Sequence, residues 1–368
     1  MELRVGFVGA RRSAAFRHFA TFDGVENYAL MDPDGHNLAI GGDALGITPE
    51  RRFTELEPLL DSGINVLVVA SPMPYHVPQA VAALERDIHV LSEVTAAVNL
   101  DQCAELVHAV RRSRATYMMA ENYAFLKSVS LVKEMAKAGL FGELYYAEGE
   151  YIHDVKSLFH NLDGSPTWRA TWQTGRNGVT YGTHSLGPCL SWLGERVVSV
   201  SCVGSGVHTM PGNRLEDSVV MSCKTEHGHL VRIRQDLVSN RPHCISYYSL
   251  QGTKGCYESP RIAGEDHRVW LADYHANEPN TWHSLWESEE EFLPQTYREF
   301  EPIAEKAGHG GGDFFEVHAF IESIRNDTLP PIDVYTALDW TLPGLMSEQS
   351  IEAGGAPVTV PDPRIAFD

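Results

Sequence analysis

The sequence lacks the features of membrane, secreted and nucleic-acid-binding proteins. No apolar run in its 368 residues approaches the length that spans a bilayer. The first residues show no basic segment followed by an apolar one and a cleavage site, so we expect no secretory signal and a cytoplasmic protein that does not bind membranes. Lysine and arginine total 29 against 49 acidic residues, and the net charge of -20 disfavours a nucleic-acid partner.

Cysteine is also scarce, and no two cysteines form a C-x-x-C pair. A chain kept in a reducing compartment uses such isolated cysteines as small buried apolar side chains. We therefore expect buried thiols and no metal site. The six residues are Cys103, Cys189, Cys202, Cys223, Cys244 and Cys256.

The length predicts two domains, and the first 120 residues alternate β-branched runs with helical patterns. This alternation is typical of a parallel sheet with crossover helices. We expect an α/β Rossmann domain over residues 1–122. Its predicted strands are 3–8, 27–31, 65–70, 88–91 and 116–120, and its predicted helices are 13–22 and 101–111.

Beyond residue 122 the pattern changes to a helix over 126–138, ended by Gly139, and then to long alternating segments. Short hairpin-like separations between these segments favour a mostly antiparallel sheet. We expect a substrate-binding and oligomerisation α+β domain over 123–368 with a large open sheet. Its predicted strands are 143–151, 197–203, 217–224, 230–237 and 245–251, followed by a helix over 314–324, whereas 257–310 has little periodicity.

A glycine-containing turn follows the first predicted strand, where a dinucleotide pyrophosphate would meet a helix N-terminus. The match to G-x-G-x-x-G is incomplete, because Arg11 occupies the second glycine position and no third glycine follows. The role of Arg11 is open: its side chain would contact the pyrophosphate, the substrate or neither. The cofactor-binding residues that we expect in this turn are Gly9, Ala10, Arg11, Arg12 and Ser13.

Polar residues at the ends of the other predicted strands complete this site. Asp32 ends the second strand, where a carboxylate accepts hydrogen bonds from the adenosine ribose and repels a 2′-phosphate. We therefore expect NAD rather than NADP. The further cofactor-binding residues predicted at the carboxyl edge are Ser71, Pro72, His76, Glu121 and Asn122.

Several blocks of sequence resemble the Gfo/Idh/MocA family over nearly the full length. They are Ser71-Pro72-Met73-Pro74-Tyr75-His76, Ser92-Glu93-Val94-Thr95, Tyr181-Gly182-Thr183-His184 and Gly252-Thr253-Lys254-Gly255. The resemblance implies a Rossmann domain and a C-terminal domain whose open sheet forms a homodimer or homotetramer, and it adds Glu93 to the cofactor site. Dehydrogenases of that family carry Glu-Lys-Pro where this chain has Glu93-Val94-Thr95, and valine cannot transfer a proton.

A closer resemblance is to the NAD-dependent oxidative glycosidases of glycoside hydrolase family 109 and its relatives, which likewise lack the lysine. Glycine at position 182 departs from the proline usual there. The shared stretches are Glu121-Asn122-Tyr123, Leu140-Phe141-Gly142-Glu143-Leu144, Tyr151-Ile152-His153-Asp154, Trp168-Arg169, Tyr181-Gly182-Thr183-His184, His309-Gly310-Gly311-Gly312-Asp313 and Val334-Tyr335 with Trp340.

This resemblance implies a redox-neutral glycoside hydrolysis. NAD+ would oxidise sugar C3, a base would remove the acidified C2 hydrogen and expel the C1 substituent, water would add, and the hydride would return. Tyr151 would be the C2 base and His184 would handle the C3 proton, with His153 and Tyr181 assisting. The residues implied to bind the sugar are Lys156, Trp168 and Arg169.

Alternatives to this hypothesis are an NAD-dependent sugar or inositol dehydrogenase with net turnover of the cofactor, and a non-catalytic NAD-binding protein. The sugar also stays open. Hexosaminides are substrates of the resembled family, and Arg11, Arg12, Lys156 and Arg169 would suit an anionic sugar such as a sulfoquinovoside.

Overall fold

The computed structural model describes residues 2–161, 163–242, 244–262 and 264–367. The chain forms two compact units, each assembled from separate stretches of sequence. Residues 1–125, 300–338 and 363–368 make up the first unit, and residues 126–299 and 339–362 make up the second. The expected domain boundary at 122/123 stays a prediction. The division into compact units does not test it, because the first unit also includes residues 300–338 and 363–368.

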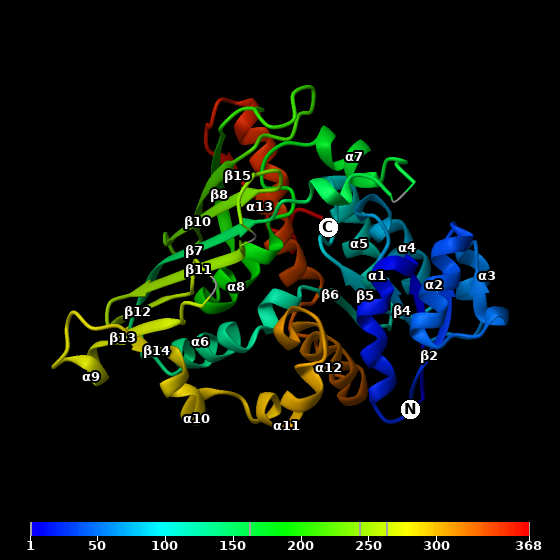
Figure 1. Cartoon of the computed structure of the whole chain (residues 1–368), viewed down its shortest axis with the longest axis horizontal. Helices are drawn as coiled ribbons and strands as arrows, with labels where there is room; N and C mark the ends of the chain where they lie inside the picture. The colour runs from blue at the N-terminus through cyan, green and yellow to red at the C-terminus, as the bar shows by residue number, and fades with distance from the viewer. Residues whose placement is uncertain (1, 162, 243, 263, 368) are drawn as a thin grey trace. The chain divides into compact units, whose positions relative to one another are not determined.

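The first unit contains a six-stranded parallel sheet in the order β3-β2-β1-β4-β5-β6. This order is that of a doubly wound dinucleotide-binding fold, with helices on both faces (Figure 1). The central strand β4 is buried along its whole length, as its continuous apolar run predicts. The strands are β1 Leu3–Val8, β2 Val25–Met31, β3 Arg52–Phe53, β4 Val66–Val69, β5 His89–Glu93 and β6 Tyr117–Ala120.

The predicted helix over 101–111 is confirmed, whereas the first predicted helix is divided and the helices over 35–45, 56–60 and 76–84 have no counterpart in the predictions. The expected helix over 13–22 is a short α1 (Ala10–Ser13) followed by a 3₁₀ helix, η1 (Ala14–Thr21). Phe16 and Phe19 are both buried, and their three-residue spacing suits the 3₁₀ period. The other helices are α2 Gly35–Leu45, α3 Leu56–Leu60, α4 His76–Leu84, α5 Leu100–Arg112 and α12 Gly312–Asn326.

The second unit contains a nine-stranded sheet in the order β14-β13-β12-β11-β7-β10-β9-β8-β15. The prediction of a mostly antiparallel sheet is confirmed; β10 and β7 form its parallel pair among the described residues. The strands are β7 Leu144–Ile152, β8 Val197–Gly204, β9 Val219–Thr225, β10 Leu230–Asp236, β11 Cys244–Gly252, β12 Gly255–Glu258, β13 Arg268–Leu271, β14 His283–Ser284 and β15 Val358–Thr359.

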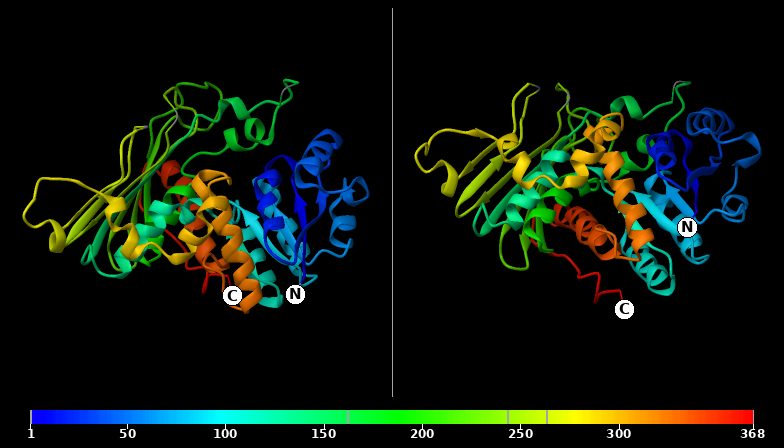
Figure 2. Two further views of the ribbon diagram at one scale, coloured as in Figure 1. Left: turned by 60° about the horizontal axis from the view of Figure 1, so that its bottom comes forward. Right: turned by 90° about the horizontal axis from the view of Figure 1, so that it is seen from below.

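One face of this sheet is packed against α8 (Thr183–Leu193), as Figure 1 shows. A Cβ atom on Gly149 of β7 would lie 2.6 Å from the carbonyl oxygen of Ser185, so glycine permits the close approach of α8 to the sheet. The remaining helices are α6 Lys127–Lys137, α7 Trp168–Thr171, α9 Ala272–His275, α10 Glu289–Phe292, α11 Gln295–Ala304 and α13 Val334–Glu352. Among the described residues, no helix covers the opposite face in the views of Figure 2.

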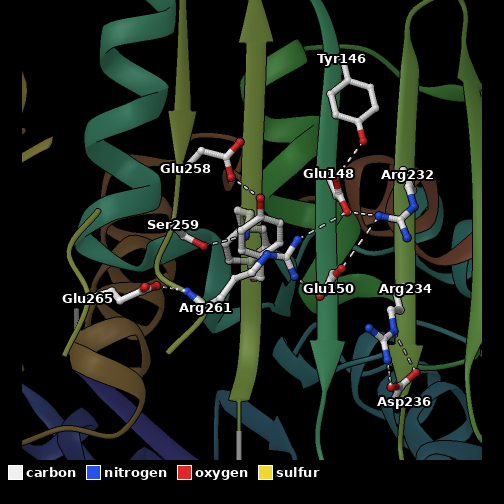
Figure 3. Close-up of polar contacts among 12 residues, drawn as sticks. Tyr146, Glu148, Glu150, Arg232, Arg234, Asp236, Glu258, Ser259, Arg261 and Glu265 are labelled. Atoms are coloured by element: carbon white, nitrogen blue, oxygen red, sulfur yellow. Dashed lines mark hydrogen bonds and ion pairs between the residues drawn. The ribbon is translucent and has the colours of Figure 1, made fainter. Parts of the chain in front are cut away.

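That opposite face carries a network of charged side chains (Figure 3). Glu148 and Glu150 of β7 are buried, and Arg232 of β10 donates to Glu148. Arg261 donates to Glu150 at 3.0 Å and lies 3.4 Å from the ring centroid of Tyr247. Buried carboxylates are costly unless paired, and the two arginines satisfy this requirement.

No helix among the described residues is both long and apolar enough to cross a bilayer. Four of the cysteines are buried, as expected, and Cys256 is half-buried. The side chain of Cys244 lies outside the described residues.

Candidate active site

The cofactor end of the first unit begins at the turn between β1 and α1. Gly9 has a left-handed φ of 89°, and a Cβ atom there would lie 2.4 Å from the carbonyl oxygen of Ala70. Glycine is therefore required for this turn to lie against the end of β4. The Ser13 hydroxyl donates to the Gly9 carbonyl at 2.9 Å and closes the turn.

Asp32 lies beside this turn at the end of β2. Its Oδ2 accepts from the backbone N–H of Ala10 at 2.8 Å, and its Oδ1 accepts from that of Asp34 at 2.9 Å. Each carboxylate oxygen has a second lone pair, so the group keeps acceptor capacity for a ribose. The contact of Asp32 with a ribose stays a prediction.

The two arginines of the turn are placed differently. Arg11 is exposed, whereas Arg12 reaches across the sheet edge. Arg12 Nε donates to the carboxylate of Glu93 at the end of β5, and its Nη2 lies 3.6 Å from Asp313 Oδ1. Burial lowers the pKa of Arg12, but Glu93 and Asp313 outweigh it, so the guanidinium is held charged. A fixed cation thus lies beside Glu93. The residue after Glu93 is Val94, whose side chain has no charge and cannot transfer a proton.

His76 joins the ends of β4 and β5. Its side chain is buried, with Nε2 2.8 Å from the Ser71 carbonyl and Nδ1 3.1 Å from the Thr95 carbonyl. Burial lowers the pKa of His76, and the neutral ring can donate to only one of these carbonyls. The geometry gives His76 a positioning role in this loop, which begins at Ser71-Pro72; direct contact with a cofactor stays a prediction.

Two polar residues follow β6. Glu121 is fully buried, and its Oε1 accepts from the backbone N–H of Tyr123 at 3.2 Å. Asn122 is 2% exposed, and within the described residues its Oδ1 has no hydrogen-bond partner. A buried acceptor without a donor is costly, so this atom fits a ligand that brings a hydroxyl or amide N–H.

The four predicted catalytic residues all belong to the second unit, where they form one cluster. The ring centroids of Tyr151 and His184 are 5.1 Å apart, and those of Tyr181 and His184 are 5.2 Å apart. Tyr151 lies 5.7 Å from both His153 and Tyr181 by the same measure. Two sequence segments about 30 residues apart therefore converge, and we call these four residues the aromatic–histidine cluster.

The frame around the cluster explains this convergence. Tyr151 lies on the face of β7 that packs against α8, and His184 lies in the first turn of α8. The Tyr248 hydroxyl donates to the backbone carbonyl of His184. Gln235 of β10 accepts from the Tyr181 backbone N–H at 3.0 Å. Strand and helix are thus fixed to each other at the cluster.

The three predicted sugar-binding residues have different surroundings. The Arg169 guanidinium lies 4.6 Å from the ring centroid of Trp168 and 5.6 Å from that of Tyr181, beside the cluster. Lys156 instead donates to Asp154 Oδ2 at 2.8 Å, the Val238 carbonyl at 2.8 Å and Asn240 Oδ1 at 2.9 Å. Since an ammonium has three N–H donors, binding of sugar by Lys156 would require exchange of these partners.

Sequence reasoning assigned no role to three polar residues of the first unit that contact predicted site residues or lie near them. His309 lies in the 3₁₀ turn that precedes α12, and Asp313 and Glu316 lie near the start of that helix. Asp313 contacts Asn122 and lies beside Arg12. The signal was present in the His309-Gly310-Gly311-Gly312-Asp313 segment, but its place beside β6 depends on tertiary structure. Within the described residues, no group of three or more His, Cys, Asp or Glu side chains is arranged to hold a metal.

Family models match both the N-terminal and the C-terminal part of the chain. A model of the oxidoreductase family with an NAD-binding Rossmann fold matches residues 3–121, and the GFO/IDH/MocA C-terminal domain matches residues 129–258. The C-terminal domain of glycosyl hydrolase 109 matches residues 213–364. Residues 3–121 thus form an NAD-binding domain.

Curated relatives agree with these models. A glycosyl hydrolase family 109 protein of Shewanella pealeana is 27% identical, with 98% of this chain and 85% of the relative covered. The protein of that name from Solibacter usitatus is 28% identical, with 98% and 88% covered.

Solved structures share the fold. Levoglucosan dehydrogenase in complex with NADH and levoglucosan matches with a TM-score of 0.82 at 18% identity, covering 98% of this chain and 100% of the other. The WlbA dehydrogenase of Bordetella pertussis, in complex with NADH and UDP-GlcNAcA, matches with a TM-score of 0.78 at 20% identity, covering 98% of both chains. The chain therefore belongs to the Gfo/Idh/MocA family of oxidoreductases, and its C-terminal part is similar to that of glycosyl hydrolase family 109 proteins.

Proposed function

We propose that this protein is an NAD-dependent glycoside hydrolase that acts by transient oxidation of a sugar at C3. The observation that carries the proposal is the aromatic–histidine cluster, which gathers proton-transfer groups in a chain with an NAD-binding domain. The similarity to glycosyl hydrolase family 109 proteins supports the same reaction class.

The first unit suits NAD in three places: the left-handed turn at Gly9, the Asp32 carboxylate and the Oδ1 atom of Asn122. When bound, NAD+ would accept a hydride from sugar C3 and return it at the end of the cycle. Valine at position 94 cannot transfer a proton, so other side chains of the protein have to carry out the proton transfers.

The aromatic–histidine cluster would perform these transfers. His184 would take the proton of the C3 hydroxyl, leaving a ketone that acidifies the C2 hydrogen. Tyr151 would then remove the C2 proton, so that a C1–C2 double bond forms and the C1 substituent leaves. Water would add at C1, and Tyr151 would return a proton to C2. The net reaction is hydrolysis, and His153 and Tyr181 would assist the leaving group and the water.

A tyrosine acts as a base only if its phenolate is stabilised, since the ordinary pKa of tyrosine is about 10. Tyr151 lies in ring contact with His153 and His184, which can donate hydrogen bonds or carry positive charge. Arg169 beside Tyr181 adds a permanent cation to the neighbourhood. The proposed mechanism requires that these neighbours stabilise the phenolate of Tyr151 against the cost of its burial.

The sugar would be a glycoside with either an N-acetyl or an anionic substituent. Arg169 suits an anionic sugar such as a sulfoquinovoside, whereas the engaged ammonium of Lys156 weakens that choice. A hexosaminide is the alternative that the family similarity supports.

An NAD-dependent sugar dehydrogenase is the second candidate, supported by the fold shared with levoglucosan dehydrogenase. That reaction consumes NAD+ once per sugar and releases no aglycone, so its products distinguish the two proposals.

We further propose a homodimer or homotetramer that uses the sheet face of Glu148 and Glu150. Because this face carries acids and arginines together, two copies related by a two-fold axis would be complementary. Light scattering that finds only monomers at working concentrations would contradict this assembly.

The test of the reaction is incubation with NAD+ and a panel of neutral and anionic aryl α- and β-glycosides. We expect aglycone release without stoichiometric NADH. Tyr151→Phe should lower the rate of release by about 100-fold or more while leaving the NADH dissociation constant unchanged, because the variant removes only the proton acceptor. Tyr274→Phe, on the exposed helix α9, is the matched control. NADH accumulation without aglycone would overturn the proposal in favour of the dehydrogenase.

A further inference from the structure

The start of α12 is built against the residue that follows β6. His309, Gly310 and Gly311 have left-handed φ values of 51°, 59° and 93°. The next residue, Gly312, lies so close that a Cβ atom on it would be 2.5 Å from the Asn122 carbonyl oxygen. Only this glycine-rich turn lets His309 and Asp313 lie beside the Asn122 side chain.

The buried carboxylate of Asp313 orients both neighbours. It accepts from Asn122 Nδ2 at 2.6 Å, and His309 Nδ1 lies 3.0 Å from its Oδ1 and 3.1 Å from its Oδ2. The Asn122 amide nitrogen also lies 3.0 Å from Nδ1. Because both oxygens of the charged carboxylate face Nδ1 and can only accept, we assign the proton to Nδ1. In the neutral imidazole, the acceptor is then Nε2.

Asp313 is suited to this task because it stays ionised. Burial raises its pKa, but the hydrogen bond from His309 and the charge of Arg12 outweigh that effect and hold the pKa below its usual value. A charged acceptor makes stronger hydrogen bonds than a neutral one, so the positions of both neighbours are well defined.

Two acceptor atoms remain available on these neighbours. Asn122 Oδ1 is buried, and His309, whose side chain is 35% exposed, uses only Nδ1 towards Asp313. In the part of the chain that the structure describes, Asn122 Oδ1 has no hydrogen-bond partner, and His309 contacts Asn122 and Asp313 through Nδ1 rather than Nε2. Two acceptors on neighbouring side chains match a ligand that carries two donors close together, such as the vicinal hydroxyls of a sugar ring.

We propose that His309, oriented by Asp313, binds the nicotinamide ribose of NAD, with Nε2 and Asn122 Oδ1 accepting from its two hydroxyls. In a doubly wound fold the dinucleotide lies across the carboxyl edge, with one nucleotide over each half of the sheet. Asp32 at β2 belongs to the adenosine half, and Asn122 after β6 belongs to the other half. This inference concerns only residues of the first unit and the binding of NAD, so it can fail while the proposed hydrolysis stands, and the reverse.

Two substitutions of His309 separate its two nitrogens. His309→Asn keeps an N–H near the Nδ1 position for Asp313 but removes the outer acceptor. His309→Gln places an amide near the Nε2 position instead. His108→Asn, on α5 of the same unit, controls for loss of a histidine.

The measurement is the dissociation constant for NADH, ADP-ribose and ADP without any sugar present, because ADP-ribose keeps the ribose in question and ADP lacks it. We expect His309→Asn to bind NADH and ADP-ribose about three- to tenfold more weakly and ADP unchanged, as for the loss of one neutral hydrogen bond. His309→Gln should retain more of the affinity.

Three results would overturn the assignment. An unchanged affinity of His309→Asn for ADP-ribose would show that His309 does not bind this ribose. An equal loss for ADP would indicate a structural effect. If NADH binding is unchanged but the NADH complex binds sugar more weakly, His309 oriented by Asp313 would bind hydroxyls of the sugar instead.

Discussion

At the residue scale, Arg12 is a cation that lies among several acidic side chains at the carboxyl edge of the first unit. Arg12 contacts Glu93 and lies 3.6 Å from Asp313, and it cannot act as a base because guanidinium does not lose its proton near neutral pH. It compensates the charge of these carboxylates, and it leaves the proton transfers to other groups. Within the described residues, Glu316 is an acidic side chain to which Arg12 does not donate a hydrogen bond.

Glu316 is fully buried, and neither of its carboxyl oxygens has a hydrogen-bond partner among the described residues. Burial first, and then the charges of Asp313 and Glu93, raise its pKa well above the usual value. The folded state therefore keeps a proton that the unfolded state releases above about pH 4.3. The free energy of unfolding must then fall as pH rises from that value to the folded-state pKa.

Replacing Glu316 with glutamine removes this proton linkage while keeping the shape of the side chain. We expect Glu316→Gln to gain stability relative to the wild type between about pH 5.5 and pH 8, measured as the difference in Tm at each pH. Glu322→Gln, farther along α12, is the control. A difference in Tm that does not change with pH would contradict the buried protonated state.

At the element scale, the sequence predicted most strands of both sheets, because buried parallel strands and half-buried antiparallel strands have distinct patterns. It did not predict the ten-residue helix α11, which contains Pro302. It also did not predict the short elements between residues 257 and 310, where β13, α9 and β14 hold two to four residues each. Elements that short have no period to detect, and their positions depend on neighbouring strands.

The polar face of the second sheet gives a prediction at this scale. Arg232→Met removes the arginine that hydrogen-bonds to the buried Glu148. Glu148 then keeps the Tyr146 hydroxyl and Arg261 at 4.0 Å, so the free energy of unfolding should fall by about 1–3 kcal/mol. Adding Glu148→Gln to that variant should recover much of the loss, since the buried charge is then gone. Denaturant unfolding of the single and double variants measures this coupling, and losses that simply add would contradict it.

At the scale of the whole molecule, the predicted cofactor-binding residues and the predicted catalytic residues belong to different units. The glycine-containing turn after the first strand predicted the NAD-binding end. The resemblance identified the four members of the aromatic–histidine cluster, and the structure brings those four together within the second unit. The Asp313–His309 pair could not be predicted, because residues 300–338 return to a unit that begins nearly 300 residues earlier. Such returns depend on tertiary packing that no local pattern contains.

Removal and return of the C2 proton distinguish the proposed hydrolysis from direct displacement at C1. The most direct test is turnover of an accepted glycoside in deuterated water with NAD+, followed by mass spectrometry and NMR of the released sugar. We expect deuterium at C2 of the product and no net formation of NADH. A hydrolysed sugar that keeps its original C2 hydrogen would contradict it, because direct displacement at C1 never breaks that bond.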